Sequence, residues 1–120
     1  MSWELKNDRP IYTQLLEQIE QKIVTGEYEL GSRMPSVRDL AAEAAVNPNT
    51  MQRAMTELEH RGLIITNRTS GRCVTEDASV VNEIRKSRAE EYTREYIGKM
   101  TELKYGREEM IHLIEKGDNK

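Results

Sequence analysis

Residues 35–74 read PSVRDLAAEAAVNPNTMQRAMTELEHRGLIITNRTSGRCV. The stretch holds two short helical patterns, each with a capping residue, and then two short apolar runs joined by a polar loop that contains glycine. This order is typical of a helix-turn-helix followed by a two-stranded hairpin, the wing. We therefore predict a mostly α chain with a small β-hairpin, in which residues 1–75 form a winged helix-turn-helix domain.

Both helices of the pair have recognisable starts. The hydroxyl of Ser36 and the carboxylate of Asp39 can each accept from a backbone N–H that the first turn of a helix leaves unpaired. Asn47 is a good N-cap for the next helix, and Pro48 suits its first position because the missing proline N–H would be unpaired there. The spacing predicts helices that begin after Ser36 and at Pro48.

The second helix carries two different faces. One is apolar and can pack on the rest of the domain; it consists of Met51, Ala54, Met55 and Leu58. The opposite face carries amide, guanidinium and hydroxyl groups, on Asn49, Gln52, Arg53 and Thr56. Asn, Gln and Arg match base edges in the major groove of DNA. A solvated face is the commoner meaning of such a stripe, but the partner helix and the hairpin favour a DNA-contacting face.

The hairpin is predicted from strands at residues 63–66 and 72–75, joined by a turn over residues 67–71. Arg68, Ser70 and Gly71 lie at its tip, where they could contact phosphates or the minor groove. A solvated tip is the alternative for each of them. Gly71 serves either as a turn former with positive φ or as a point of close backbone approach to DNA.

Three segments carry a family resemblance: PIYTQLLEQIEQKIVTGEY, GSRMPSVRDLAAEAAVNPNTMQRAMTELEHRGLI and SGRCV. Together they resemble the N-terminal DNA-binding domain of the GntR family of bacterial transcription regulators, over residues 10–75. Cys73 departs from the family pattern, which usually has an aromatic residue there. A buried cysteine mostly behaves as a small hydrophobe, so we expect a packing role.

The resemblance implies a set of DNA contacts. Arg38 matches an arginine that contacts DNA, and Ser36 can offer its hydroxyl or N–H to a phosphate. The recognition-helix contact positions match Asn47, Asn49, Thr50, Gln52 and Arg53. Arg38 and Arg53 are expected to contribute most to binding, whereas capping is an alternative role for Asn47 and Thr50.

A third helix is predicted before the pair, from Pro10 to Gly26. Its apolar face consists of Ile11, Leu15, Leu16, Ile19 and Ile23. Gly26 is a natural residue to end a helix. We expect this helix to support the helix-turn-helix, and we expect Trp3 to be an anchor on either the domain or a partner subunit.

The overall charge of −3, with a sequence pI near 5.5, argues against a nucleic-acid partner. The distribution of cations weakens that objection, because every cation between Ile23 and Ile84 is an arginine: Arg33, Arg38, Arg53, Arg61, Arg68 and Arg72. The planar guanidinium suits phosphate and guanine better than ammonium does. Surface solubility is our interpretation of Arg33 and Arg61.

Residues 76–120 form a charged helical tail with a sparse apolar stripe. A break at Tyr105 and Gly106 divides it into a long helix and a short one over Arg107–Lys116. Such a stripe cannot make a core alone, so we expect this dimerisation segment to pack on a second copy of the chain. The expected interface residues are Ile84, Tyr92, Tyr96, Met100, Leu103, Met110, Ile111 and Ile114. The tail resembles the YtrA-type subfamily, which implies a small repressor, often of a neighbouring transporter operon.

Catalytic and metal-binding patterns are not found. His60 and His112 are the only histidines, they fall in different predicted elements, and no phosphate loop or nucleophile with a plausible base accompanies them. We therefore expect no enzyme and no cofactor. With one cysteine and no signal peptide or membrane-span pattern, we expect a cytoplasmic protein. The alternatives are a winged-helix protein-interaction module and a ligand sensor whose effector binds at the dimer interface around Tyr92, Tyr96 and Tyr105.

Overall fold

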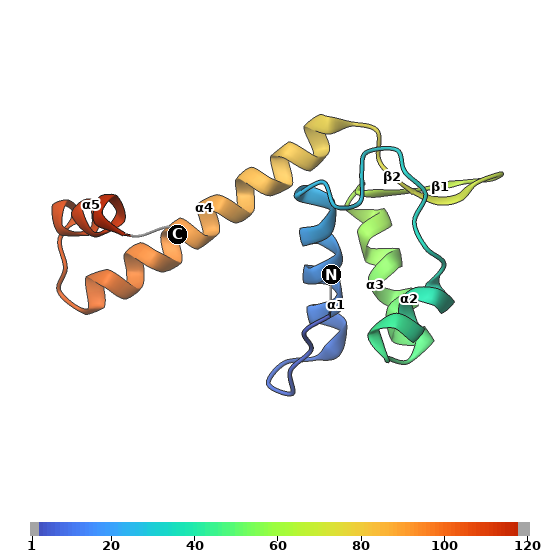
Figure 1. The fold of residues 1–120 in the computed structure, drawn as a ribbon, viewed down its shortest axis with the longest axis horizontal. Coiled ribbons are helices and arrows are strands. Elements are labelled where there is room, and N and C mark those ends of the chain that lie inside the picture. The colour runs from blue at the N-terminus through green and yellow to red at the C-terminus, as the bar shows by residue number, and fades with distance from the viewer. Residues whose placement is uncertain (1–2, 118–120) are drawn as a thin grey trace. The chain divides into compact units, whose positions relative to one another are not determined.

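The computed structural model describes residues 3–117, which form five helices and one two-stranded antiparallel sheet (Figure 1). In chain order the elements are α1 (Ile11–Val24), α2 (Val37–Ala44), α3 (Pro48–His60), β1 (Ile64–Asn67), β2 (Gly71–Val74), α4 (Ala78–Glu102) and α5 (Arg107–Lys116). The predicted class, a mostly α winged helix-turn-helix, is confirmed. Contacts divide the chain into two compact units, one on each side of the Ile84–Arg85 bond.

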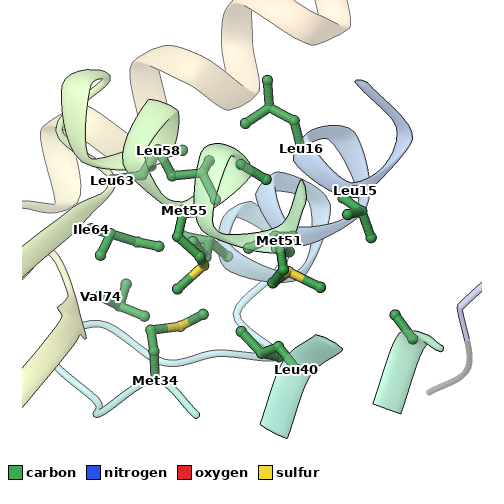
Figure 2. Packing of buried hydrophobic residues seen from close by; sticks show 14 of the residues in the cluster. Leu15, Leu16, Met34, Leu40, Met51, Met55, Leu58, Leu63, Ile64 and Val74 are labelled. Atoms are coloured by element: carbon green, nitrogen blue, oxygen red, sulfur yellow. The ribbon is translucent and has the colours of Figure 1, made fainter. Parts of the chain in front are cut away.

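Helix α3 lies at the centre of the first unit, where it packs on α1, α2 and β1. Its side chains Met51 and Met55 are fully buried, and Figure 2 shows them among Leu15 and Leu16 of α1 and Leu40 of α2. Met34 and Val74 complete the core on the wing side. The apolar residues of α3 recur at helical spacing, so one face of the helix is buried and the opposite face stays free.

The two predicted helix starts are confirmed. The Ser36 hydroxyl accepts from the N–H of Asp39 at 3.0 Å, and Oδ1 of Asn47 accepts from the N–H of Asn49 at 2.7 Å. Between them, Ala45 ends α2 in the left-handed conformation, with φ 59° and ψ 47°. These bonds satisfy backbone donors that a helix start leaves unpaired, which explains the sharp break between α2 and α3.

The wing is a hairpin whose register runs from the pair Ile64 and Val74 to the pair Asn67 and Gly71. Its turn is held by Oδ1 of Asn67, which accepts from the N–H groups of Thr69 and Ser70. Gly71 follows with φ +79°, so its role as a turn former is confirmed. Both strands are displaced from the predicted ranges by one residue. The N–H of Thr75 donates to the carbonyl of Leu63 at 2.9 Å, so hydrogen bonding continues to the predicted outer residues.

A third extended segment lies beside β2, and no pattern in the sequence predicts it. The N–H of Met34 donates to the carbonyl of Arg72 at 2.8 Å, and the N–H of Val74 donates to the carbonyl of Ser32 at 2.8 Å. Arg33 thereby forms a bridge with Cys73. The segment before α2 is therefore hydrogen-bonded to the base of the wing, and Cys73 is partly buried in the strand it pairs with.

Trp3 is an anchor on its own domain. Its Nε1–H donates to Oε1 of Glu43 at 3.0 Å, and its ring lies 4.0 Å from Nζ of Lys22, which is almost completely buried. The side chains of Gln14 and Gln18 bind the backbone of the residues that follow Trp3. The N-terminal segment is therefore tied to α1 and α2.

The first turns of α4 belong to the first unit. Val81 is buried in its core, and Val80 and Ile84 pack partly against that core. The first unit thus extends beyond residue 75, where we expected the DNA-binding domain to end. Ile84, which we expected at a dimer interface, is half-buried within its own subunit.

The second unit contains the rest of α4 and α5. Helix α5 starts after Gly106, whose N–H donates to Oε1 of Glu109 at 2.8 Å. Of the residues expected at a dimer interface, Met110 is buried within its own chain, and Tyr96 and Met100 are half-buried. The exposed members are Tyr92, Leu103, Ile111 and Ile114. Within residues 3–117, no helix combines the length and the apolar character that crossing a membrane requires.

Candidate nucleic-acid interface

A groove of about 620 Å³ lies where the start of α2, the polar face of α3 and the first residues of β2 come together. It is lined by Arg33, Met34, Pro35, Ser36, Val37, Asp39, Gln52, Gly71 and Arg72. Three residues predicted to contact DNA, from three different elements, therefore border one space: Ser36, Gln52 and Gly71. Two arginines and the N-terminus of a helix give it groups that attract a phosphate.

The predicted polar face of α3 is exposed. Asn49, Gln52 and Arg53 have exposed side chains, while Thr50 is half-buried and its backbone N–H donates to the carbonyl of Asn47. Nε2 of Gln52 donates to Oγ1 of Thr56 at 3.2 Å, one turn further along the helix. Amide, hydroxyl and guanidinium groups thus stand together at the N-terminal half of α3, the part of a recognition helix that reaches base edges.

Arg53 has a partner that sequence reasoning missed. Its guanidinium carbon lies 4.1 Å from the centre of the Tyr12 ring, which is a cation–π contact between α3 and the start of α1. The stack restricts the arginine side chain while its N–H groups remain available at the rim of the ring. No local pattern reports this pair, because the two residues are far apart in the sequence.

Arg38 and Arg68 are the least restrained cations among the predicted contacts. Arg38 is exposed near the start of α2, and Arg68 is exposed at the tip of the wing. Neither side chain forms an ion pair with residues 3–117. Ser70 is half-buried beside Arg68, where its N–H holds the turn through Asn67. Both arginines are therefore available to a phosphate backbone.

Arg61, which we interpreted as surface charge, is exposed and also forms two ion pairs. Its Nη1 lies 3.2 Å from Oε2 of Glu20 in α1, and its Nε lies 3.1 Å from Oε2 of Glu57 in α3. The guanidinium joins α1 to α3 and is not part of the groove lining. Arg33 keeps an exposed side chain at the groove.

In the part of the chain that the structure describes, no three His, Cys, Asp or Glu side chains are grouped so that they could hold a metal ion.

The fold and the exposed face of α3 define the class of helix-turn-helix DNA-binding proteins. Residues 11–74 match the family model of bacterial regulatory proteins of the gntR family. The chain belongs to this family, and it is a DNA-binding transcriptional regulator, not an enzyme.

Relatives and solved structures agree with this assignment. The chain is 35% identical over 114 residues to the uncharacterized HTH-type transcriptional regulator YhcF of Bacillus subtilis, covering 95% of this chain and 94% of that protein. It is 38% identical over 73 residues to the HTH-type transcriptional repressor YtrA of Bacillus subtilis, covering 61% and 56% of the two chains. A GntR family transcriptional regulator from Listeria monocytogenes has a similar structure, with a TM-score of 0.89, 37% identity and coverage of 95% of this chain and 100% of that one.

Proposed function

We propose that the protein is a homodimeric repressor that binds an inverted-repeat operator. The observation that carries the proposal is the groove, which brings Ser36, Gln52 and Gly71 from three elements to the exposed face of α3. The similarity to a repressor, YtrA, supports the direction of regulation. In this proposal α3 lies in the major groove of DNA.

The contacts fall into two groups. Base edges are read by the amide and guanidinium groups of Asn49, Gln52 and Arg53, because these groups can form paired hydrogen bonds with guanine and adenine. Phosphates are bound by Arg38, by Arg68 and by the N-terminus of α2 at Ser36. The first group determines which DNA sequence is bound, and the second determines the position of the domain on the duplex.

The second copy is expected to cover the exposed apolar side chains of the second unit. Leu103 is 66% exposed and Ile114 is 63% exposed, although both are large and aliphatic. Burying such side chains between two copies is favourable by about 25 cal/mol for each Å² of apolar surface. An effector, if one regulates the protein, would bind near Tyr92 and Tyr105 at this interface.

A two-fold dimer presents two copies of α3, so the operator should be an inverted repeat. Its half-site centres should be about one helical turn of DNA apart, roughly 34 Å, or a multiple of that distance. The resemblance to YtrA-type regulators supports a neighbouring transporter operon as the target of repression. The protein would act on chromosomal DNA in the cytoplasm.

The test is binding of the purified protein to the DNA upstream of its own gene, with the salt concentration varied. We expect a Kd of about 10⁻⁸ M or tighter that weakens steeply with salt, and a large loss for Gln52→Ala. Glu57→Gln is the matched control, because Glu57 also lies on α3 but pairs with Arg61 and does not line the groove. Binding that is equally weak on all DNA sequences would contradict the proposal and favour a protein-interaction module.

A further inference from the structure

Glu59 joins the recognition helix to both strands of the wing. It lies in the last turn of α3, where its Oε2 accepts a hydrogen bond from the hydroxyl of Thr66 in β1. The same oxygen lies 3.6 Å from Nε of Arg72 in β2. Thr66 and Arg72 are directly opposite each other in the hairpin. One carboxylate oxygen therefore contacts a cross-strand pair.

The surroundings of Arg72 make this contact important. Its Nε is buried and has no hydrogen-bond partner among the described residues. A buried guanidinium N–H without an acceptor is unfavourable unless an opposite charge is close. The side chains of Arg72 and Glu59 are 26% and 25% exposed, so their attraction is only partly screened by solvent. Glu59 supplies the negative charge that holds Arg72 in place.

Backbone pairing with residues 32–34 holds β2 only as far as Arg72, whose carbonyl accepts from the N–H of Met34. Each strand has four residues, and an isolated hairpin of this length is at best marginally stable. The base of the wing is packed through Leu63, Ile64 and Val74, which are buried. Beyond the pair Thr66 and Arg72, the turn is held by the pairing of Asn67 with Gly71 and by the bonds that Oδ1 of Asn67 accepts from Thr69 and Ser70.

We propose that Glu59 is a positioning residue for DNA binding: it sets the direction of the wing on α3 and keeps the Arg72 charge from binding phosphate non-specifically. This inference rests on the proposed function. Arg72 also lines the groove beside Gln52. Loss of the Glu59 charge would therefore release a cation into the groove at the same time as it frees the wing tip.

These two effects have opposite consequences for specific and non-specific binding. A free wing tip places Arg68 and Ser70 less accurately, so the affinity for the operator falls. A released Arg72 adds one phosphate contact, so the affinity for random DNA rises, and the slope of log K against log salt becomes steeper by about one. A residue with a merely structural role would lower both affinities together.

The experiment is a double-mutant cycle with Glu59→Gln and Arg68→Ala, measured on the operator and on random DNA over a range of salt. Glu57→Gln is the matched control, because Glu57 is also on α3 but pairs with Arg61, away from the wing. We expect Glu59→Gln to reduce the preference for the operator by about tenfold or more, and to reduce the effect of Arg68→Ala by about threefold or more. The melting temperature of each variant shows whether it is folded.

The outcomes separate this proposal from the proposed function. If the wild-type protein shows no preference for any DNA sequence, the proposed function is wrong. If the wild type binds its operator but Glu59→Gln and Arg68→Ala have independent, multiplicative effects, only the positioning role of Glu59 is wrong. Should Glu59→Gln unfold the domain, Thr66→Val and Arg72→Gln remove the two halves of the contact separately, and both must then lower the operator preference.

Discussion

Asn47 illustrates how one side chain can serve the fold and the site at once. Its Oδ1 caps α3 by accepting the N–H of Asn49, which leaves its amide nitrogen free of that bond. The capping role could be predicted from the sequence, because a cap is local and Asn followed by proline is a strong helix start. The amide nitrogen can also donate a hydrogen bond to DNA, whereas a carboxylate at the same position cannot.

Two substitutions at Asn47 separate these roles. Asn47→Asp keeps the capping oxygen and should leave the free energy of unfolding nearly unchanged, whereas Asn47→Ala should lower it by about 1 kcal/mol. If the amide donates to DNA, Asn47→Asp should nevertheless weaken operator binding. Chemical denaturation and binding titrations measure the two quantities. Full operator affinity in Asn47→Asp would assign Asn47 to capping alone.

Arg53 and Tyr12 should act as a unit. Arg53→Ala should weaken operator binding by about 1–3 kcal/mol if its guanidinium binds a base edge. Tyr12→Leu should cost about 0.5–1 kcal/mol of binding, because it removes the ring that restricts the arginine, and Tyr12→Phe should be nearly neutral. Titrations on the operator measure all three losses. Equal losses in Tyr12→Leu and Tyr12→Phe would show that the hydroxyl, not the ring, is what matters.

Residue contacts across the fold could not be predicted in the same way. The stack of Arg53 on Tyr12 and the ion pair of Arg61 with Glu20 join residues about forty positions apart, and no periodicity links them. The sequence shows the positive charge of Arg61, but it does not show that Glu20 is its partner. Predictions were therefore accurate for caps and helix faces, and incomplete for side chains that join one helix to another.

At the scale of elements, α3 shows why its boundaries and buried face were predictable. Its cap, its first-position proline and its apolar spacing all indicate the same helix, and agreement among such local signals is typical of natural sequences. The extended segment at residues 32–34 was not predictable, since its hydrogen bonds are made to β2 across the fold. That segment leads directly into α2, so it also positions Ser36 at the groove.

The packing of α3 leads to a stability prediction. Met55 is fully buried at the centre of the core, so Met55→Ala should lower the free energy of unfolding by about 2–5 kcal/mol through lost contacts and a cavity. Ile65, half exposed on β1, provides the control, and Ile65→Ala should change stability by only about 0.5 kcal/mol. Urea denaturation followed by circular dichroism measures both. Similar losses for the two variants would contradict the central position of α3.

The start of α4 should be sensitive to acid. The side chain and the backbone N–H of Ser79 donate to the Asp77 carboxylate at 2.6 and 3.0 Å, and these bonds hold the pKa of Asp77 below its ordinary value of 3.8. A depressed pKa in the folded state stabilises the protein above pH 3.8, and this contribution is lost as the pH falls through the folded pKa. The difference in melting temperature between wild type and Asp77→Ala should therefore shrink between pH 6 and pH 3. A difference that stays constant over this range would contradict a stabilising role of the ionised Asp77 carboxylate.

For the whole molecule, the two units differ in how completely they bury their apolar side chains. The first unit has its own core, while the second leaves large apolar side chains exposed. The sequence predicted this contrast, because the stripe over the tail is too sparse for a core of its own. It did not predict that Met110 and Ile84 would be covered within a single chain, since both have the same apolar character and spacing as the exposed members of the stripe.

Dimerisation is open to a direct test. Ile114→Glu should give a monomer in analytical ultracentrifugation, because it places a charge on an exposed apolar side chain of the second unit. Operator affinity should fall by roughly a hundredfold or more, since two linked half-sites bind far more tightly than one. Leu30→Glu, at a similarly exposed aliphatic residue of the first unit, is the matched control and should remain dimeric. A dimeric Ile114→Glu would place the interface elsewhere.

The most direct test of sequence reading is to select binding sites from random double-stranded DNA with the wild-type protein and to sequence the selected DNA. The central claim is that a dimer reads sequence through the exposed face of α3. It predicts enrichment of an inverted repeat whose half-site centres are about 10 base pairs apart, or a multiple of that distance. It also predicts that Gln52→Ala changes the enriched bases within each half-site. Enrichment of no sequence, or of a single unsymmetric half-site, would contradict the claim.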